Sequence, residues 1–158
     1  MFTSTQEVAD FISEQNIELV DVRFCDVPGV QQHFTIPVSE FLDAALSDGL
    51  MFDGSSVRGF TAIHESDMKL IPDISSAFVD PFRDRKTLVV NFSIVDPFTD
   101  EPFSRDPRQV AAKAEAYLRS TGIADECFIG AEAEFYLFDD VRYQVTPHNT
   151  FFSVDSPE

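Results

Sequence analysis

The segment ELVDVRFCDVPGVQQHFTIP, residues 18–37, gives the clearest indication of the fold. Its first half places Val20, Val22 and Phe24 at every second position, with polar residues and a cysteine between them, which is the spacing of a half-buried strand. VPGV supplies a Pro-Gly turn, and QQHFTIP, residues 31–37, has the composition of a returning strand. We therefore expect a β-hairpin here.

Two helices are predicted on either side of this hairpin. The first begins with STQE, residues 4–7, which has the spacing of a capping box, and apolar residues at helical intervals continue it to about Gln15. The second opens at Ser39 and ends at Gly49. MFDGSSVRGF, residues 51–60, is rich in glycine and serine and is predicted to be a loop.

Three further strands are predicted after this loop, and the last is long and central by its apolar content. They are MKLIPD at 68–73, SAFVDPF at 76–82 and KTLVVNFSIVDP at 86–97. A hairpin, a helix and further strands make a small mixed sheet with one helix packed across it. This layout resembles a ubiquitin-like β-grasp, within an α+β fold.

A second domain is predicted to begin after a proline-rich linker, DPFTDEPFSRDP, residues 96–107. Asp106 then caps a helix with Pro107 in its first turn, and Gly122 closes it. GAEAEFYLF, residues 130–138, is predicted to form a strand, with little regular structure after it.

The boundary is placed so that residues 1–103 form the β-grasp domain and residues 104–158 begin an incomplete second domain. One helix and one or two strands cannot bury the apolar residues of the second segment unaided.

Composition excludes several classes of function. With 44% apolar residues and 17 phenylalanines among 158 residues, the chain can build a packed core. A formal net charge of −17 argues against nucleic-acid binding, because a polyanion requires clustered lysines and arginines. No apolar run approaches the ~20 residues of a membrane-spanning helix and no signal pattern precedes the first helix, so a cytoplasmic protein is expected.

Cys25 and Cys127 are predicted to be isolated buried thiols rather than a disulfide or a metal pair.

Two glutamates, Glu132 and Glu134, lie one residue apart in GAEAEFYLF. On a strand their side chains would point to the same face, roughly 6.6 Å apart. At an effective dielectric constant of about 20 they would repel each other by roughly 2.5 kcal/mol. Spacing alone favours a solvated strand face with the alanines and Phe135 turned inward. A ligand pair for Mg²⁺ or Mn²⁺ and the carboxylate pair of a glycosidase stay open.

The loop FDGSS, residues 52–56, is the second candidate site, because Asp53 could receive a cation or a proton there. Composition favours an Asx turn in which the carboxylate binds its own backbone. His33, His64 and His148 lack the spacing of metal ligands, so surface or hydrogen-bonded structural roles are expected. The sequence contains no GxxxxGK[ST], GxGxxG, GxSxG or HExxH pattern, so the corresponding nucleotide-binding and hydrolase classes lose their usual support.

Three segments together resemble the N-terminal part of bacterial type I glutamine synthetases: MFDGSSVRGF, HESDMKLIPD and GAEAEFYLF. CDVPGVQQHFTIP is similar to the hairpin of that family, and the order and separation of the four segments agree. The resemblance covers essentially the whole chain. It implies a β-grasp domain followed by the start of an α+β catalytic domain. It also implies ATP-dependent ligation of ammonia to glutamate through γ-glutamyl phosphate, in a homododecamer whose active sites are shared between neighbouring subunits.

The same resemblance assigns expected roles to individual residues. Glu132 and Glu134 resemble the pair that helps to hold two divalent cations, Mg²⁺ or Mn²⁺, each leaning towards a different metal, and the cations would offset the repulsion between the carboxylates. Asp53 resembles the aspartate that binds ammonium and draws its proton away. Ser56, in the same loop, is a further candidate for substrate binding. The chain departs from the family at Ala133, often proline, and at His64, often asparagine, and neither change replaces a reacting group.

In the family's pattern the remaining metal ligands, the ATP pocket and the arginines around the phosphoryl group lie beyond Glu158. The chain is therefore expected to be an N-terminal part of a glutamine synthetase, inactive by itself. The alternative is a free-standing β-grasp interaction module without catalysis. The length of the natural gene product distinguishes the two.

Overall fold

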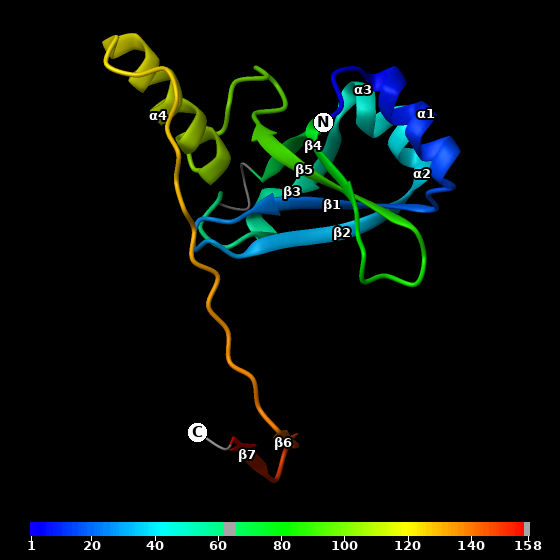
Figure 1. Cartoon of the computed structure of the whole chain (residues 1–158), viewed down its shortest axis with the longest axis vertical. Helices are drawn as coiled ribbons and strands as arrows, with labels where there is room; N and C mark the ends of the chain where they lie inside the picture. The colour runs from blue at the N-terminus through cyan, green and yellow to red at the C-terminus, as the bar shows by residue number, and fades with distance from the viewer. Residues whose placement is uncertain (62–65, 157–158) are drawn as a thin grey trace. The chain divides into compact units, whose positions relative to one another are not determined.

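The computed structural model describes residues 1–61 and 66–156, and the chain divides into two compact units, residues 1–126 and 127–158 (Figure 1). The domain boundary placed after residue 103 comes from the sequence pattern alone and stays a prediction.

The first unit is built on a five-stranded mixed sheet in the order β2-β1-β5-β4-β3. β1 and β5 are parallel and every other neighbouring pair is antiparallel. β5 lies in the middle of the sheet, as its apolar content predicts. The strands are β1 Leu19–Cys25, β2 Gln31–Pro37, β3 Leu50–Asp53, β4 Asp67–Val79 and β5 Thr87–Val95.

The predicted hairpin of β1 and β2 is confirmed. Val20 and Val22 face the core and are fully buried. The chain turns between the strands at Gly29, whose φ of +93° suits glycine. The half-buried character predicted for β1 is wrong at Asp21, which is also fully buried, because the guanidinium groups of Arg23 and Arg83 both bind its carboxylate.

The first predicted helix is α1, Thr5–Gln15. The hydroxyl of its N-cap, Ser4, accepts a hydrogen bond from the backbone N–H of Glu7 at 3.2 Å. The carboxylate of Glu7 accepts from the backbone N–H of Thr3, one residue earlier than a standard capping box requires. The predicted cap therefore forms, but the side chain of Glu7 binds the backbone N–H of Thr3 where a capping box would use that of Ser4.

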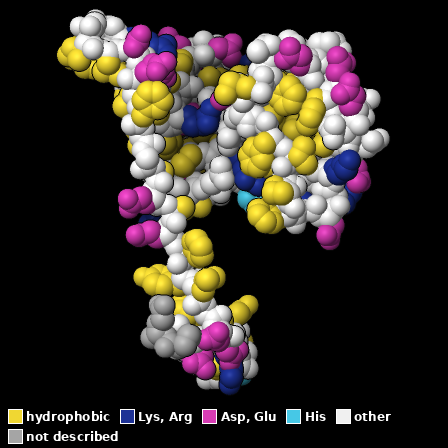
Figure 2. All heavy atoms as spheres, viewed as in Figure 1, with side chains coloured by type: hydrophobic (Ala, Val, Ile, Leu, Met, Phe, Trp, Pro, Cys, Tyr) yellow, Lys and Arg dark blue, Asp and Glu magenta, His cyan; other side chains and the backbone are white. Residues whose placement is uncertain are grey.

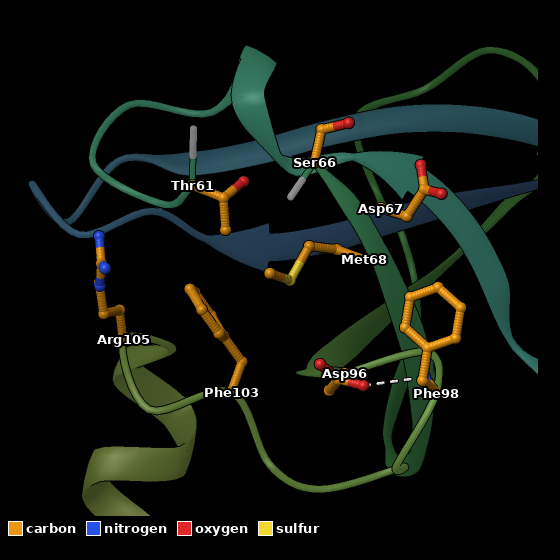
Figure 3. A pocket seen from close by; sticks show the side chains of 8 residues that line it. All are labelled: Thr61, Ser66, Asp67, Met68, Asp96, Phe98, Phe103 and Arg105. Atoms are coloured by element: carbon orange, nitrogen blue, oxygen red, sulfur yellow. Dashed lines mark hydrogen bonds between the residues drawn. The ribbon is translucent and has the colours of Figure 1, made fainter. Parts of the chain in front are cut away.

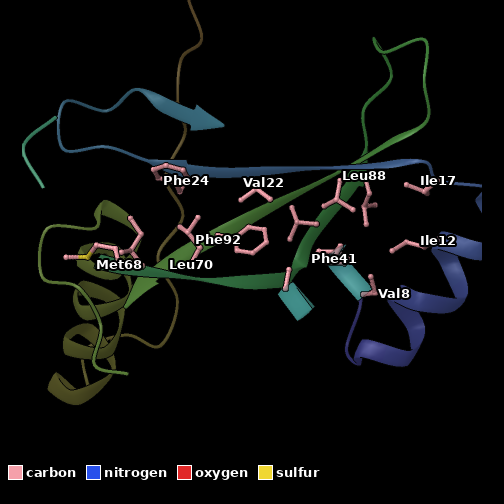
Figure 4. Close-up of a cluster of buried hydrophobic side chains, with 14 of the residues drawn as sticks. Val8, Ile12, Ile17, Val22, Phe24, Phe41, Met68, Leu70, Leu88 and Phe92 are labelled. Atoms are coloured by element: carbon pink, nitrogen blue, oxygen red, sulfur yellow. The ribbon is translucent and has the colours of Figure 1, made fainter. Parts of the chain in front are cut away.

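The second helical segment is continuous from 38 to 48 and contains a π-helical turn, with the parts α2 Val38–Glu40, η1 Phe41–Ala45 and α3 Leu46–Asp48. It ends at Gly49, where a Cβ atom would lie 2.5 Å from the carbonyl oxygen of Leu70. One helix was predicted across the sheet, but α1 packs on the core as well. Figure 4 shows Val8 and Ile12 of α1 and Phe41 of η1 turned towards the strands.

Strand boundaries after residue 49 differ from the predictions. Residues 51–53 of the predicted loop belong to β3, which pairs antiparallel with β4. The two strands predicted at 68–73 and 76–82 form the single strand β4, whose register with β5 shifts between Asp73 and Phe78. A side chain bridges the two strands at this shift. The hydroxyl of Ser76 accepts a hydrogen bond from the backbone N–H of Asn91 in β5.

The segment predicted as a linker, residues 96–107, has little regular secondary structure up to α4, but it is bonded to the central strand. The backbone N–H of Phe103 donates to the carbonyl of Ile94 at 2.9 Å, and the carboxylate of Asp106 accepts from the N–H of Ile94. Asp106 also caps the predicted helix, α4 Pro107–Thr121, which ends at Gly122. The segment therefore continues the hydrogen bonding of β5 into α4.

The second unit contains an antiparallel hairpin of β6 Asp140–Val145 and β7 Thr150–Asp155, which sequence patterns missed. The strand predicted at 130–138 is wrong: this segment has no regular secondary structure. A strand requires a neighbour to pair its backbone groups, and no described residue pairs with it. Nearly all apolar side chains of the described part of this unit are at the surface (Figure 2).

Candidate functional site

Asp53 lies at the end of β3 and caps a 3-10 turn, η2 Gly54–Ser56. Its carboxylate accepts hydrogen bonds from the backbone N–H of Ser55 at 2.9 Å, from the hydroxyl of Ser55 at 2.6 Å and from the hydroxyl of Ser56 at 3.3 Å. The bond to the backbone two residues ahead is the Asx turn that composition favours. The side chain is also exposed, so the turn leaves the carboxylate open to a ligand.

The charge of Asp53 is fixed by the same contacts. The hydrogen bond from the hydroxyl of Ser55, followed by that from its backbone N–H, lowers the pKa of the carboxyl below its usual value. Asp53 is therefore ionised at neutral pH. It can attract a small cation and accept hydrogen bonds from it, and it holds a proton only weakly.

The start of the loop is set by Gly54, which is buried against β4. Its N–H donates to the carbonyl of Ser66 at 2.7 Å. A Cβ atom at this position would lie 2.7 Å from the Cγ atom of Met68 and 3.1 Å from the carbonyl oxygen of Ser66. A larger residue would push the turn, and Asp53 with it, away from the sheet.

The end of the loop is held by the segment that precedes α4. The ring of Phe60 is buried and meets the ring of Phe103 edge to face, with centroids 5.3 Å apart. The guanidinium group of Arg105 donates to the carbonyl oxygens of Gly59 and Phe60. Sequence reasoning missed Arg105, because nothing in the spacing of RDP relates it to a loop more than forty residues earlier.

A cavity of about 530 Å³ lies beside this loop. Figure 3 shows Phe103 and Arg105 extending from the segment before α4, with Thr61 and Met68 across from them. The hydroxyl of Thr61 is buried and has no hydrogen-bond partner in the described part of the chain. His64, for which a structural role is predicted, lies outside the described residues.

Glu132 and Glu134, the predicted metal ligands, lie in the irregular segment of the second unit, and both are exposed. The alanines beside them are exposed too, so the predicted division into a wet and an inward face does not form. The described residues contain no group of three or more histidine, cysteine, aspartate or glutamate side chains that could hold a metal ion. Asp53 and Ser56 share one loop of the first unit, and the glutamates belong to the second.

The two cysteines and His33 differ in their surroundings. Cys25 is half-buried, and burial, followed by the charges of Asp26 and Asp106, raises the pKa of its thiol. The prediction of a buried thiol is wrong for Cys127, which is exposed, and neither cysteine is in a disulfide. His33 lies with its Nδ1 atom 3.1 Å from the carboxylate of Asp21, in agreement with a hydrogen-bonded role.

No helix in the described part of the chain is long and apolar enough to cross a membrane.

Two protein-family models match the chain. The model described as glutamine synthetase, beta-Grasp domain, matches residues 16–97, and the one described as glutamine synthetase, catalytic domain, matches residues 104–158. The chain belongs to the glutamine synthetase family. The resemblance noted from its motifs is thereby confirmed, as is the β-grasp fold of the first part of the chain.

Curated relatives agree with this membership, and a solved structure agrees with the fold. The chain is 58% identical over 158 residues to the glutamine synthetase of Frankia alni, covering 100% of this chain and 33% of that protein. It is 58% identical over 153 residues to the glutamine synthetase of Mycolicibacterium smegmatis, covering 97% and 32%. The cryo-EM structure of Plasmodium falciparum glutamine synthetase matches 99% of this chain and 30% of its own with a TM-score of 0.78; at 22% identity this likeness shows the fold alone. The chain thus spans about a third of the length of the curated relatives that it matches.

Proposed function

We propose that the chain is part of a glutamate–ammonia ligase, which joins ammonia to L-glutamate at the expense of ATP and forms L-glutamine through γ-glutamyl phosphate. The observation that carries this proposal is the 58% identity to a glutamine synthetase over all 158 residues. Residues 104–158 match a catalytic-domain model, which disfavours a free-standing β-grasp interaction module.

Asp53 is the group that we assign to ammonium. Its carboxylate is exposed and ionised, and three hydrogen bonds from Ser55 and Ser56 fix its direction. An ionised carboxylate attracts ammonium and accepts one of its N–H groups. The carboxylate first takes one proton from ammonium, which leaves neutral ammonia with a free lone pair. Ammonia then attacks the γ-carbonyl carbon, phosphate leaves as the C–O bond breaks, and the nitrogen loses a second proton to the departing phosphate or to water, so that a neutral amide remains. Ser56 would help to orient that carboxylate and to bind the substrate.

Glu132 and Glu134 are the groups that we assign to divalent cations. Carboxylate oxygens are the donors that Mg²⁺ and Mn²⁺ prefer, and both side chains are exposed. The donor type fits, but two carboxylates do not complete a site, so the other ligands must come from other residues. When bound, the cations would offset the repulsion between these carboxylates and neutralise charge on the phosphates of ATP.

The assembly that we propose is a cytoplasmic homododecamer in which Asp53 of one subunit acts with Glu132 and Glu134 of its neighbour. The placement of Asp53 in the stretch matched by the β-grasp model, and of the glutamates in the stretch matched by the catalytic-domain model, supports a site assembled from two domains.

The activity is tested on the full-length protein. Purified protein is incubated with ATP, glutamate, ammonium and Mg²⁺ or Mn²⁺, and glutamine is measured, with each component omitted in turn. We expect glutamine only in the complete mixtures. Asp53→Asn should lower the rate strongly, whereas Asp43→Asn, at another exposed aspartate of the same unit, should not. A folded, assembled protein that forms no glutamine under any of these conditions would contradict the proposal.

A further inference from the structure

Arg105 makes a contact that the proposed chemistry does not by itself require. Its Nη1 atom lies 3.0 Å from the carbonyl oxygen of Gly59 and 2.6 Å from that of Phe60. These are consecutive carbonyls at the end of the loop that begins with Asp53. A single charged donor therefore fixes two neighbouring peptide groups.

The base from which Arg105 reaches this loop is firmly anchored. Phe103 is bonded through its backbone N–H to Ile94 of the central strand, and its ring packs against the buried ring of Phe60. Asp106, on the other side of Arg105, is fully buried and also bonded to Ile94. Arg105 thus lies between two residues that are bonded to β5, one through its backbone and one through its side chain, and its guanidinium group extends towards the loop (Figure 3).

The loop itself is a chain of hydrogen-bonded turns that leads back to Asp53. The N–H of Phe60 donates to the carbonyl of Val57 at 3.2 Å, and the N–H of Val57 donates to the carbonyl of Gly54 at 3.1 Å. Gly54 directly follows Asp53, and its N–H is bonded to the carbonyl of Ser66, the residue before β4. A shift at the far end is therefore passed through two turns to the residue beside the carboxylate.

The charge and shape of arginine suit this task. Hydrogen bonds from a charged donor are stronger than neutral ones, and the guanidinium group offers several N–H groups in a fixed plane. The carbonyl of Phe60 is partly buried, so losing its donor leaves an acceptor with restricted access to water. Glutamine at position 105 would replace the guanidinium group by a neutral amide, on a shorter side chain, that donates weaker hydrogen bonds.

We infer that Arg105 is a positioning residue for the ammonium site: it holds residues 54–60 so that Asp53 presents its carboxylate to the substrate. This inference rests on the role proposed above for Asp53. Arg105 lies in the stretch matched by the catalytic-domain model and the loop in that matched by the β-grasp model. The geometry of the ammonium site thus depends on a residue outside the β-grasp match.

The test uses the full-length protein with the variants Arg105→Gln and Arg105→Lys. Arg85→Gln is the matched control, because Arg85 is a surface arginine paired with Glu18 and does not contact the loop. KM for ammonium, glutamate and ATP, and kcat, are measured for each. For Arg105→Gln we expect KM for ammonium to rise about tenfold, the scale of one charge-assisted hydrogen bond. KM for glutamate and ATP should stay within about twofold, because the change weakens the binding of ammonium alone, equally in the ground state and in the transition state.

Arg105→Lys keeps a charged donor but lacks the planar guanidinium group, so its KM for ammonium should lie between those of the wild type and Arg105→Gln. Arg85→Gln should match the wild type. If Arg105→Gln does not assemble, a rise in KM confined to ammonium in Arg105→Lys still supports the inference. An Arg105→Gln enzyme with wild-type KM for ammonium would overturn it. Equal rises in all three KM values would do the same, since they indicate general loss of structure.

Hydrogen exchange separates this inference from the function on which it rests. In Arg105→Gln the backbone amides of Val57 and Phe60 should exchange faster, whereas those of β5 should be unchanged. If the wild-type protein forms no glutamine, the proposed function fails, but the exchange rates still show whether Arg105 holds the loop. Unchanged exchange at both amides would overturn the inference even in an active enzyme.

Discussion

Asp106 and Ile94 are joined by a hydrogen bond of 2.9 Å from the backbone N–H of the central strand to a carboxylate oxygen. The other oxygen of the same carboxylate accepts the N–H of Arg108 at 2.9 Å and caps α4. One fully buried side chain thus completes the hydrogen bonding of β5 and begins a helix. It ties the segment that carries Phe103 and Arg105 to the sheet.

Asp106→Ala should lower the free energy of unfolding by about 2–4 kcal/mol, because it removes a helix cap and leaves the buried N–H of Ile94 without an acceptor. Asp106→Asn should also destabilise, since its amide nitrogen would face one of two N–H donors. Urea denaturation followed by circular dichroism measures the effect, with Asp84→Ala at an exposed position as the control. Equal midpoints for Asp106→Ala and the control would contradict this account of the cap.

Asp21 should make the stability of the protein sensitive to acid. Burial alone raises the pKa of Asp21, but hydrogen bonds from Arg23, His33 and Thr35, together with the charge of Arg83, bring it below its usual value. Since the folded pKa is below the unfolded one, the stabilisation is complete above the unfolded value of about 3.9 and is lost as the pH falls through the folded value.

Asp21→Asn should therefore cost about 2–3 kcal/mol at pH 7, where it removes a charge that faces two arginines. The difference from the wild type should shrink below about pH 4, as the wild-type carboxyl becomes neutral. Urea midpoints of both proteins between neutral and acidic pH measure it. A difference that stays constant over this range would show that shape, and not charge, accounts for the contribution of Asp21.

Glu132→Gln and Glu134→Gln in the full-length protein should each weaken the binding of Mn²⁺ by about 10- to 100-fold at one class of site, because glutamine keeps the shape and removes the charge. The two variants should affect different sites. Calorimetric titration measures the affinities, and Glu126→Gln, at an exposed glutamate a few residues earlier, is the control. Wild-type metal affinity in both variants would show that these glutamates are solvated surface residues and not metal ligands.

Co-assembly tests whether the site is shared between subunits. Homo-oligomers of Asp53→Ala and of Glu132→Gln should each be nearly inactive. Random mixing of the two chains in equal amounts should restore activity to about a quarter of wild type, since one interface in four pairs two intact halves and the two lesions act independently. Two affinity tags and tandem purification isolate the mixed oligomers. If Asp53 served the glutamates of its own chain, every site would carry one lesion and the mixture would stay inactive.

Local patterns in the sequence predicted the elements whose signals lie within a few residues. The hairpin at 18–37 follows from apolar residues at every second position around a Pro-Gly turn, and α1 and α4 follow from their caps. The motifs FDGSS and GAEAEF also led to the family. None of these features depends on what the rest of the chain does.

The tertiary structure decided the features that depend on distant partners. Residues 51–53 form a strand because their backbone pairs with β4. Residues 130–138 do not form one, because no described strand pairs with them. Arg23, His33 and Thr35 bind the buried carboxylate of Asp21. Arg83, far along the chain, adds a second guanidinium group to it. The alternation of apolar and polar residues within a segment cannot reveal which distant strand or charged side chain that segment will contact.

The candidate site divides in the same way. The sequence by itself determined the identity of Asp53 and its Asx turn, because the serines that bind its carboxylate follow it directly in the chain. Only the tertiary structure decided that Arg105 holds the far end of that loop. Its two hydrogen bonds join residues 45 and 46 positions apart, and such contacts form only after the sheet has brought both segments together.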